Sequence, residues 1–105
     1  MAGEVQIPFA AGQTLGFLIR DRNGRPYSSS GYFDPTYVTA NYAFYVNSFT
    51  EQGTAGGYYL GTFPAAISGG IYSLVAKRQQ GGSPAETDPS VGGGDVHWDG
   101  TRVIS

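Results

Sequence analysis

The chain has 105 residues, a formal net charge of −2 and no cysteine, so we predict one domain over residues 1–105 with a single core and no disulfide, thiolate metal site or cysteine nucleophile. The charged fraction is only 13%, and the six basic residues form no stripe that could follow a phosphate backbone. We therefore expect no nucleic-acid partner.

The N-terminal segment, residues 1–8, has neither the basic start nor the long apolar stretch of a signal peptide. The chain also has no apolar run of about 18 residues that could span a membrane. We therefore expect a protein that is made in a cytoplasm and has no membrane partner.

The first part of the chain alternates apolar and polar residues between turns, and no segment sustains a helical period, which is typical of an all-β fold. Residues 5–9 predict a first strand, and Pro8 marks it as an edge strand because proline has no N–H. Residues 14–20 are apolar on both faces, which predicts a central strand. Residues 21–26 contain Asn-Gly, a strong signal for a tight hairpin turn.

The rest of the chain continues this pattern. We predict an exposed connection over 28–31, β-prone pieces at 32–33, 37–39 and 42–46, a turn at 52–57, strands at 58–63, 71–77 and 95–98, and a short C-terminal extension at 101–105. The segment 79–94 is rich in Gly, Pro and Ser and lacks apolar periodicity. It predicts a long loop, and loops of this length tend to be functional or mobile.

Two features of the sequence stand out: a strand that runs into Asp21-x-x-Gly24-x-Pro26, and the Gly-Tyr pairs at 57–59 and 70–72 with the Phe-Pro-Ala corner at 63–65 between them. Both resemble immunoglobulin-like modules of bacteria and phages. Together with the segment 83–88 and the closing Trp-Asp-Gly at 98–100, the stretch 58–100 is similar to small modules of phage particle proteins, such as capsid decoration proteins and tail or fibre attachments. With the strand pattern, this resemblance implies a single immunoglobulin-like antiparallel β-sandwich of about seven to eight short strands.

His97 is the only histidine, and in a strand it would share one face with Asp95 and Asp99. This arrangement is compatible with the histidine and aspartate of a Ser-His-Asp hydrolase. The simpler interpretation is a half-exposed strand with Val96 and Trp98 turned inward, because no nucleophile elbow or oxyanion loop accompanies the histidine. We therefore predict no catalytic residue and no enzyme.

Two further motifs are similar to parts of known ligand sites. Residues 21–24 are similar to the opening of a calcium loop but lack the remaining ligands and the closing Glu, which favours a hairpin turn. Residues 92–94 are three glycines, as in phosphate-binding loops, but no helix follows whose N-terminus could receive the anion. We predict no metal and no cofactor.

Aromatic residues crowd the middle third of the chain, more of them than one face of a small sandwich should bury. They are Tyr27, Tyr32, Phe33, Tyr37, Tyr42, Phe44, Tyr45 and Phe49. We predict that some face outward as a protein interface, with Tyr32, Tyr37, Tyr42 and Tyr45 as the candidate residues. A purely structural role at the ends of the sandwich and a platform for stacking sugars are the alternatives.

These observations predict a non-enzymatic structural protein of a phage particle. We expect it to dock on major capsid or tail subunits as a decoration or cement protein, to form a homo-oligomer, and to end in the virion after synthesis in the host cytoplasm. An adhesin-like or carbohydrate-binding β-sandwich module is the alternative. A small hydrolase that uses His97 is the third hypothesis.

Overall fold

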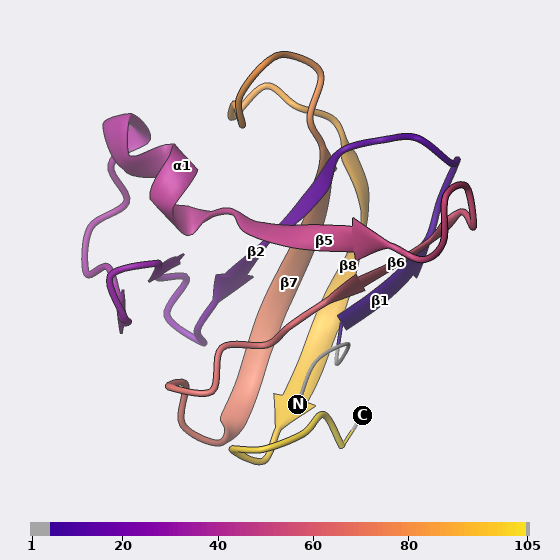
Figure 1. Cartoon of the computed structure of the whole chain (residues 1–105). Coiled ribbons are helices and arrows are strands. Elements are labelled where there is room, and N and C mark those ends of the chain that lie inside the picture. Colours follow the sequence, from indigo (N-terminus) through magenta and orange to yellow (C-terminus); the bar gives the residue numbers. More distant parts are fainter. Residues whose placement is uncertain (1–4, 105) are drawn as a thin grey trace.

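The computed structural model describes residues 5–104 and shows a mostly β chain with one short helical segment (Figure 1). The strands are β1 (Val5–Pro8), β2 (Leu15–Arg20), β3 (Tyr27–Ser28), β4 (Tyr32–Phe33), β5 (Asn47–Glu51), β6 (Tyr58–Gly61), β7 (Gly70–Arg78) and β8 (Ser90–Trp98). The helical segment joins a 3-10 turn, η1 (Thr39–Asn41), to one turn of α-helix, α1 (Tyr42–Tyr45). Within residues 5–104 no helix is long and apolar enough to cross a membrane.

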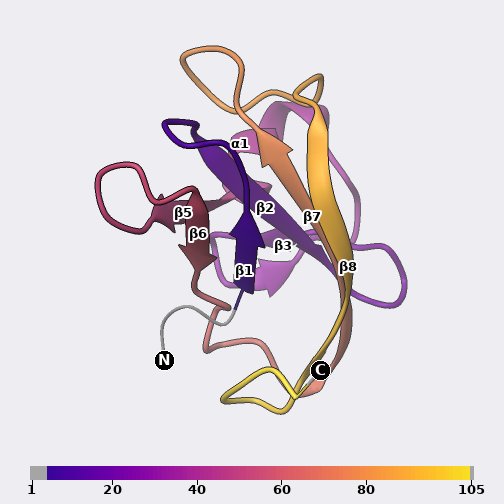
Figure 2. The same cartoon turned by 90° about the vertical axis from the view of Figure 1, so that its right-hand side faces the viewer.

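The six longer strands form one antiparallel sheet in the order β1-β6-β5-β2-β7-β8, and β3 and β4 form a separate hairpin. The sheet curls until its two edges, β1 and β8, lie side by side (Figure 2). Of the predicted fold class, the mostly β and antiparallel character is confirmed. The arrangement is a nearly closed barrel with an added hairpin, and it is not clearly an immunoglobulin sandwich.

The core lies inside the barrel and is dominated by aromatic residues. Strand β2 is buried on both faces: Phe17 and Ile19 belong to the main core, and Leu18 belongs to a second cluster on the other side. The predicted central position of this strand is confirmed by its place between β5 and β7. Proline at position 8 does lie on an edge strand, since β1 pairs with β6 alone.

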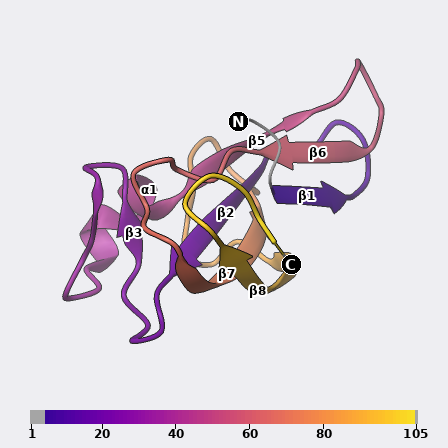
Figure 3. The same ribbon diagram turned by 90° about the horizontal axis from the view of Figure 1, so that it is seen from below.

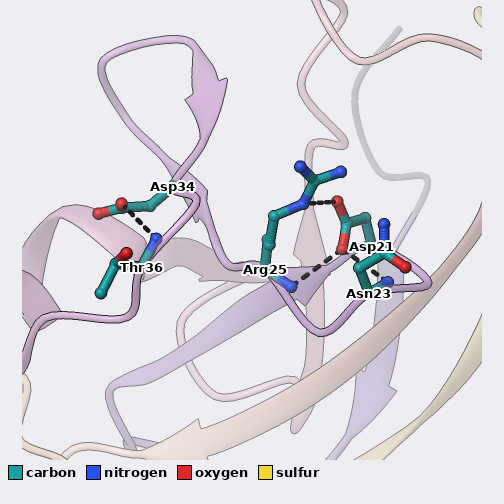
Figure 4. Close-up of polar contacts among 5 residues, drawn as sticks. All are labelled: Asp21, Asn23, Arg25, Asp34 and Thr36. Atoms are coloured by element: carbon teal, nitrogen blue, oxygen red, sulfur yellow. Dashed lines mark hydrogen bonds and ion pairs between the residues drawn. The ribbon is translucent and has the colours of Figure 1, made fainter.

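The turn after β2 forms as the Asn-Gly signal predicts. The Asp21 carboxylate accepts hydrogen bonds from the backbone N–H of Asn23 and of Arg25, each at 2.9 Å, and from Arg25 Nε at 2.7 Å (Figure 4). Gly24 adopts a φ of 78°, which favours glycine. The Asp21 carboxylate is therefore used to close a turn, as the hairpin interpretation expects.

Five segments differ from the sequence prediction. The expected exposed connection at 28–31 begins with Ser28, which is buried in β3. The β-prone piece at 37–39 forms no strand and ends in the 3-10 turn η1. The β-prone piece at 42–46 is mostly helix α1, β5 was not predicted, and the expected loop at 79–94 ends early because β8 begins at Ser90. In each case tertiary pairing or burial decides the local structure against the local propensity.

Candidate functional site

Residues 27–46 form a lobe that projects from one side of the barrel, and we call it the aromatic lobe (Figures 1 and 3). It contains the β3–β4 hairpin and the helical segment. Ser29 N–H donates to the carbonyl of Phe44 at 2.8 Å, which ties the hairpin to α1. The aromatic side chains of the lobe are therefore held on a fixed frame instead of on a free loop.

Two of the four predicted interface tyrosines point into the protein. Tyr42 and Tyr45 are three residues apart on α1, so they share one face of the helix, and this face packs against Leu18. Tyr45 is 0% exposed and Tyr42 is 7% exposed. The expectation that these two side chains face outward is wrong, because both are buried in the lobe; Tyr32 and Tyr37 remain as candidate interface residues.

A hydrogen-bond network fixes Tyr45 in this position. Its hydroxyl donates to Asp34 Oδ2 at 2.6 Å and accepts from the backbone N–H of Val38 at 3.2 Å. Asp34 Oδ1 accepts from the N–H of Thr36 at 3.1 Å (Figure 4). The lobe is thus organised around a buried tyrosine, and its shape depends on that residue.

Four large apolar side chains of the lobe are exposed: Tyr32 is 53% exposed, Phe44 is 55% exposed, and Tyr37 and Val38 are also exposed. We call these four residues the aromatic patch. The sequence prediction identified Tyr32 and Tyr37 but did not select Phe44 as a site residue. The signal that could have found Phe44 is helical: if residues 42 and 45 point inward, residue 44 points outward.

Tyr37 connects the patch to the loop that follows β7. Its hydroxyl donates to Glu86 Oε2, and the Arg20 guanidinium lies 5.7 Å from the centre of its ring. Partial burial, together with the hydrogen bond and the negative charge of Glu86, raises the pKa of Tyr37 to about 12. The neutral phenol is therefore the form that the fold favours.

We expect titration of Tyr37 to report on this contact. Because its folded-state pKa is raised, the contribution of Tyr37 to stability is present below its ordinary pKa of about 10 and is lost as the pH rises through 12. Phenolate absorbance should show a tyrosine titrating near pH 12 that Tyr37→Phe lacks, and Glu86→Gln should lower that pKa. Titration of Tyr37 at its ordinary pKa in the native protein would contradict the Glu86 contact.

The first part of the 79–94 segment is a loop, as predicted, but it is folded onto β7. The buried Asp88 carboxylate accepts from the N–H of Gln80 at 3.2 Å and of Ala85 at 3.0 Å. Lys77 Nζ donates to the carbonyl of Asp88 at 3.2 Å. These contacts hold the loop, and with it Glu86, beside the aromatic lobe.

Of the two carboxylates near His97, Asp99 is engaged in a turn and Asp95 is exposed. Asp99 Oδ1 accepts from the N–H of Thr101 and of Arg102, each at 2.8 Å. These bonds close the turn at residues 99–102, and they lower the pKa of Asp99 to about 2. Asp95 is exposed at the rim of a cavity on the far side of the barrel from the lobe. Within residues 5–104 no three of the His, Asp and Glu side chains lie close enough together to hold a metal ion.

Comparison with known proteins gives no relative from which a function could be transferred. No protein-family model, curated protein or solved structure matches the chain significantly. The function therefore has to be inferred from the surface chemistry of the chain itself. The exposed surface with the clearest chemical character near the predicted interface residues is the aromatic patch.

Proposed function

We propose that this chain is a non-enzymatic protein-binding module that docks through its aromatic patch. The observation that carries the proposal is the exposure of Tyr32 and Phe44, both more than half accessible, on a lobe whose interior is packed. Aromatic side chains that are exposed on a rigid frame bury large apolar areas on docking and lose little conformational entropy. Core packing does not account for their position, because other aromatic residues fill the core.

The low charge of the lobe supports the same function. Among residues 27–46 the only ionisable acid is Asp34, which accepts the Tyr45 hydroxyl, and there is no Lys or Arg. Docking of this surface therefore desolvates few charged groups, which favours a protein interface. Hydrogen bonds at the rim are available from serine and threonine residues of the lobe, which suits the polar border of such an interface.

We propose that the protein acts on a phage particle. We infer from the resemblance of residues 58–100 to phage particle modules that the chain decorates or cements capsid or tail subunits, as a homo-oligomer on the virion. The immunoglobulin-like relationship is part of this same proposal. A small, weakly charged β module with one apolar docking surface is suited to a repeated protein lattice, because copies that self-associate through that surface can hold neighbouring subunits together.

Replacing Tyr32 and Phe44 together by serine tests the docking surface. We expect the purified chain to self-associate in sedimentation experiments and the double variant to stay monomeric, because the apolar contact area is removed. The thermal midpoint should change little, since both side chains are more than half exposed.

A matched control is Ile71→Ser, which removes an exposed apolar side chain from the barrel instead of the lobe. It should leave self-association unchanged. A monomeric native chain that binds a glycan array through Tyr32 and Phe44 would replace the proposal by the carbohydrate-binding alternative. A native chain that is monomeric and binds no glycan would contradict the aromatic patch as a docking surface.

A further inference from the structure

The barrel has an open seam between strands β1 and β8. The two strands lie edge to edge there, on the side of the barrel away from the aromatic lobe (Figures 2 and 3), but no ladder pair joins them. Strand β1 pairs with β6 and strand β8 pairs with β7, so each presents its other edge to the seam. An unpaired edge carries main-chain N–H and C=O groups that can receive a further strand.

A cavity of about 420 Å³ opens at this seam. Its floor is apolar and includes Phe17, Leu74 and Ala76. In the β7–β8 register Leu74 lies opposite Gly94 and Ala76 lies opposite Gly92, so the glycines occupy inward positions without a side chain. The cavity exists because the wall beside the seam is built from glycine.

The side chain of Ile7 partly closes the seam. A Cβ atom on Gly92 would lie 2.7 Å from Ile7 Cδ1, so glycine is needed there for the two strands to approach. A Cβ atom on Gly94 would meet nothing within 4 Å. The seam is therefore narrow at Ile7 and open beside Gly94, and an incoming strand has to displace Ile7 and shift β1, which only four residue pairs hold to β6.

The chain itself shows how the β8 edge accepts a strand. After the turn capped by Asp99, Val103 forms an antiparallel bridge with Trp98, and Ile104 N–H donates to the carbonyl of His97 at 2.8 Å. Val103 packs on the main core, and Ile104 is exposed. The alternation of a strand has thus begun at one end of the β8 edge, and the part of this edge from Ser90 to Val96 lies ahead of it.

We propose that this edge of β8 binds an extended segment of a partner protein, which runs antiparallel to β8 in line with residues 103–104. Alternate apolar side chains of the segment enter the cavity beside Gly94 and Gly92. Main-chain pairing supplies affinity and the cavity supplies selectivity, as in other cases of strand addition. A hydrocarbon ligand could not pair with the main-chain groups on the outer edge of β8, which favours a peptide as the occupant.

The negative charge at the seam predicts where the partner segment carries a basic residue. Among the described residues 5–104, Asp95 is the one ionisable side chain that lines the cavity. In the register set by Val103 and Trp98, the position opposite Asp95 comes before those opposite Gly94 and Gly92. The segment should therefore carry a Lys or Arg on the N-terminal side of its inward apolar residues. This surface is separate from the aromatic patch, so the inference does not rest on the proposed docking function.

An extension of the chain tests the register directly. The segment Lys-Val-Thr-Val-Thr-Thr, added after residue 105, places lysine opposite Asp95 and the two valines opposite Gly94 and Gly92. The matched control, Lys-Thr-Val-Thr-Val-Thr, has the same composition but turns its valines outward. We expect the first extension to raise the thermal midpoint by several degrees and to protect the amides of residues 90–96 from hydrogen exchange. Equal midpoints and equal exchange for the two extensions would overturn the proposal.

The same segment, as a fluorescent peptide, tests binding to the native chain in trans. We expect amide shifts confined to β8 and β1, and about tenfold weaker binding to Ala76→Leu, which fills the cavity. Asp95→Asn, at an exposed position, should weaken binding a few-fold without affecting the fold. The Tyr32→Ser, Phe44→Ser double variant should bind the peptide normally, so failure at one surface is distinguished from failure at the other. Shifts elsewhere, or no binding, would overturn the proposal.

Discussion

Trp98→Ala is expected to lower the free energy of unfolding by about 3–5 kcal/mol. Trp98 is only 2% exposed, its ring stacks on Phe63 with centroids 4.4 Å apart, and its Nε1–H donates to the carbonyl of Ile67 at 2.8 Å. Truncation leaves a cavity in the core and leaves that carbonyl without its donor. Because domains of this size are stable by about 5–15 kcal/mol, a large part of the total stability is lost.

Denaturant unfolding followed by far-UV circular dichroism measures this effect, since the variant has no tryptophan left for fluorescence. Ile71→Ala is the matched control: Ile71 lies opposite His97 at the same end of the barrel and is 41% exposed. The control should cost less than about 1 kcal/mol. Similar losses for the two variants, or a native Trp98 that acrylamide quenches freely, would contradict burial of Trp98 in the core.

Strands with their own apolar alternation could be predicted from the sequence. Strands β2 and β7 alternate or are apolar along their whole length, and β1 carries an edge proline, so local pattern and tertiary position agree. Trp98 was predicted to face inward with Val96 from the polar residues between and around them, and its burial is confirmed. Alternation fixes which face of a strand is buried, but it does not fix strand order. Hence the antiparallel class could be predicted and the curl into a nearly closed barrel could not.

The segments that the sequence did not reveal depend on their neighbours. Strand β5 has no apolar alternation beyond Phe49 and is a strand because β2 and β6 pair with it. Residues 92–94 have no β propensity, yet they pair with residues of β7 along the open seam. The sequence therefore predicted a loop where the β8 side of the seam lies. Glycine gives the same local signal in a loop as in a strand that leaves room for another chain.

The crowding of aromatic residues marks the segment of the lobe in the sequence, but it does not separate the inner from the outer side chains. Aromatic residues favour strands, so 42–46 was predicted as a β-prone piece, whereas the chain makes a helical turn that buries Tyr42 and Tyr45 against Leu18. A strand would have put residues 42 and 44 on one face. The helix instead puts residues 42 and 45 together and turns Phe44 outward, which changes the membership of the exposed patch.

Tyr45→Ala is expected to disorganise the lobe and to lower the thermal midpoint by more than about 10 °C. The ring is fully buried beside Leu18, and the hydroxyl links Asp34 to the backbone of Val38. Tyr45→Phe keeps the ring and removes only the hydroxyl, so it should lower the midpoint less. The matched control is Tyr37→Ala, which removes a more exposed tyrosine whose ring centre lies 5.4 Å from that of Tyr45.

Thermal unfolding and amide spectra of the three variants separate a core role of Tyr45 from an interface role. If Tyr45 is a core residue, Tyr45→Ala lowers the midpoint and shifts amides throughout residues 27–46, and Tyr37→Ala does neither to the same extent. Loss of self-association in Tyr45→Ala with an unchanged midpoint would instead show that Tyr45 contacts a partner. Since the patch residues Tyr32 and Phe44 are positioned by the frame that Tyr45 holds, the core role also predicts that Tyr45→Ala loses docking together with lobe structure, whereas the surface variants lose docking alone.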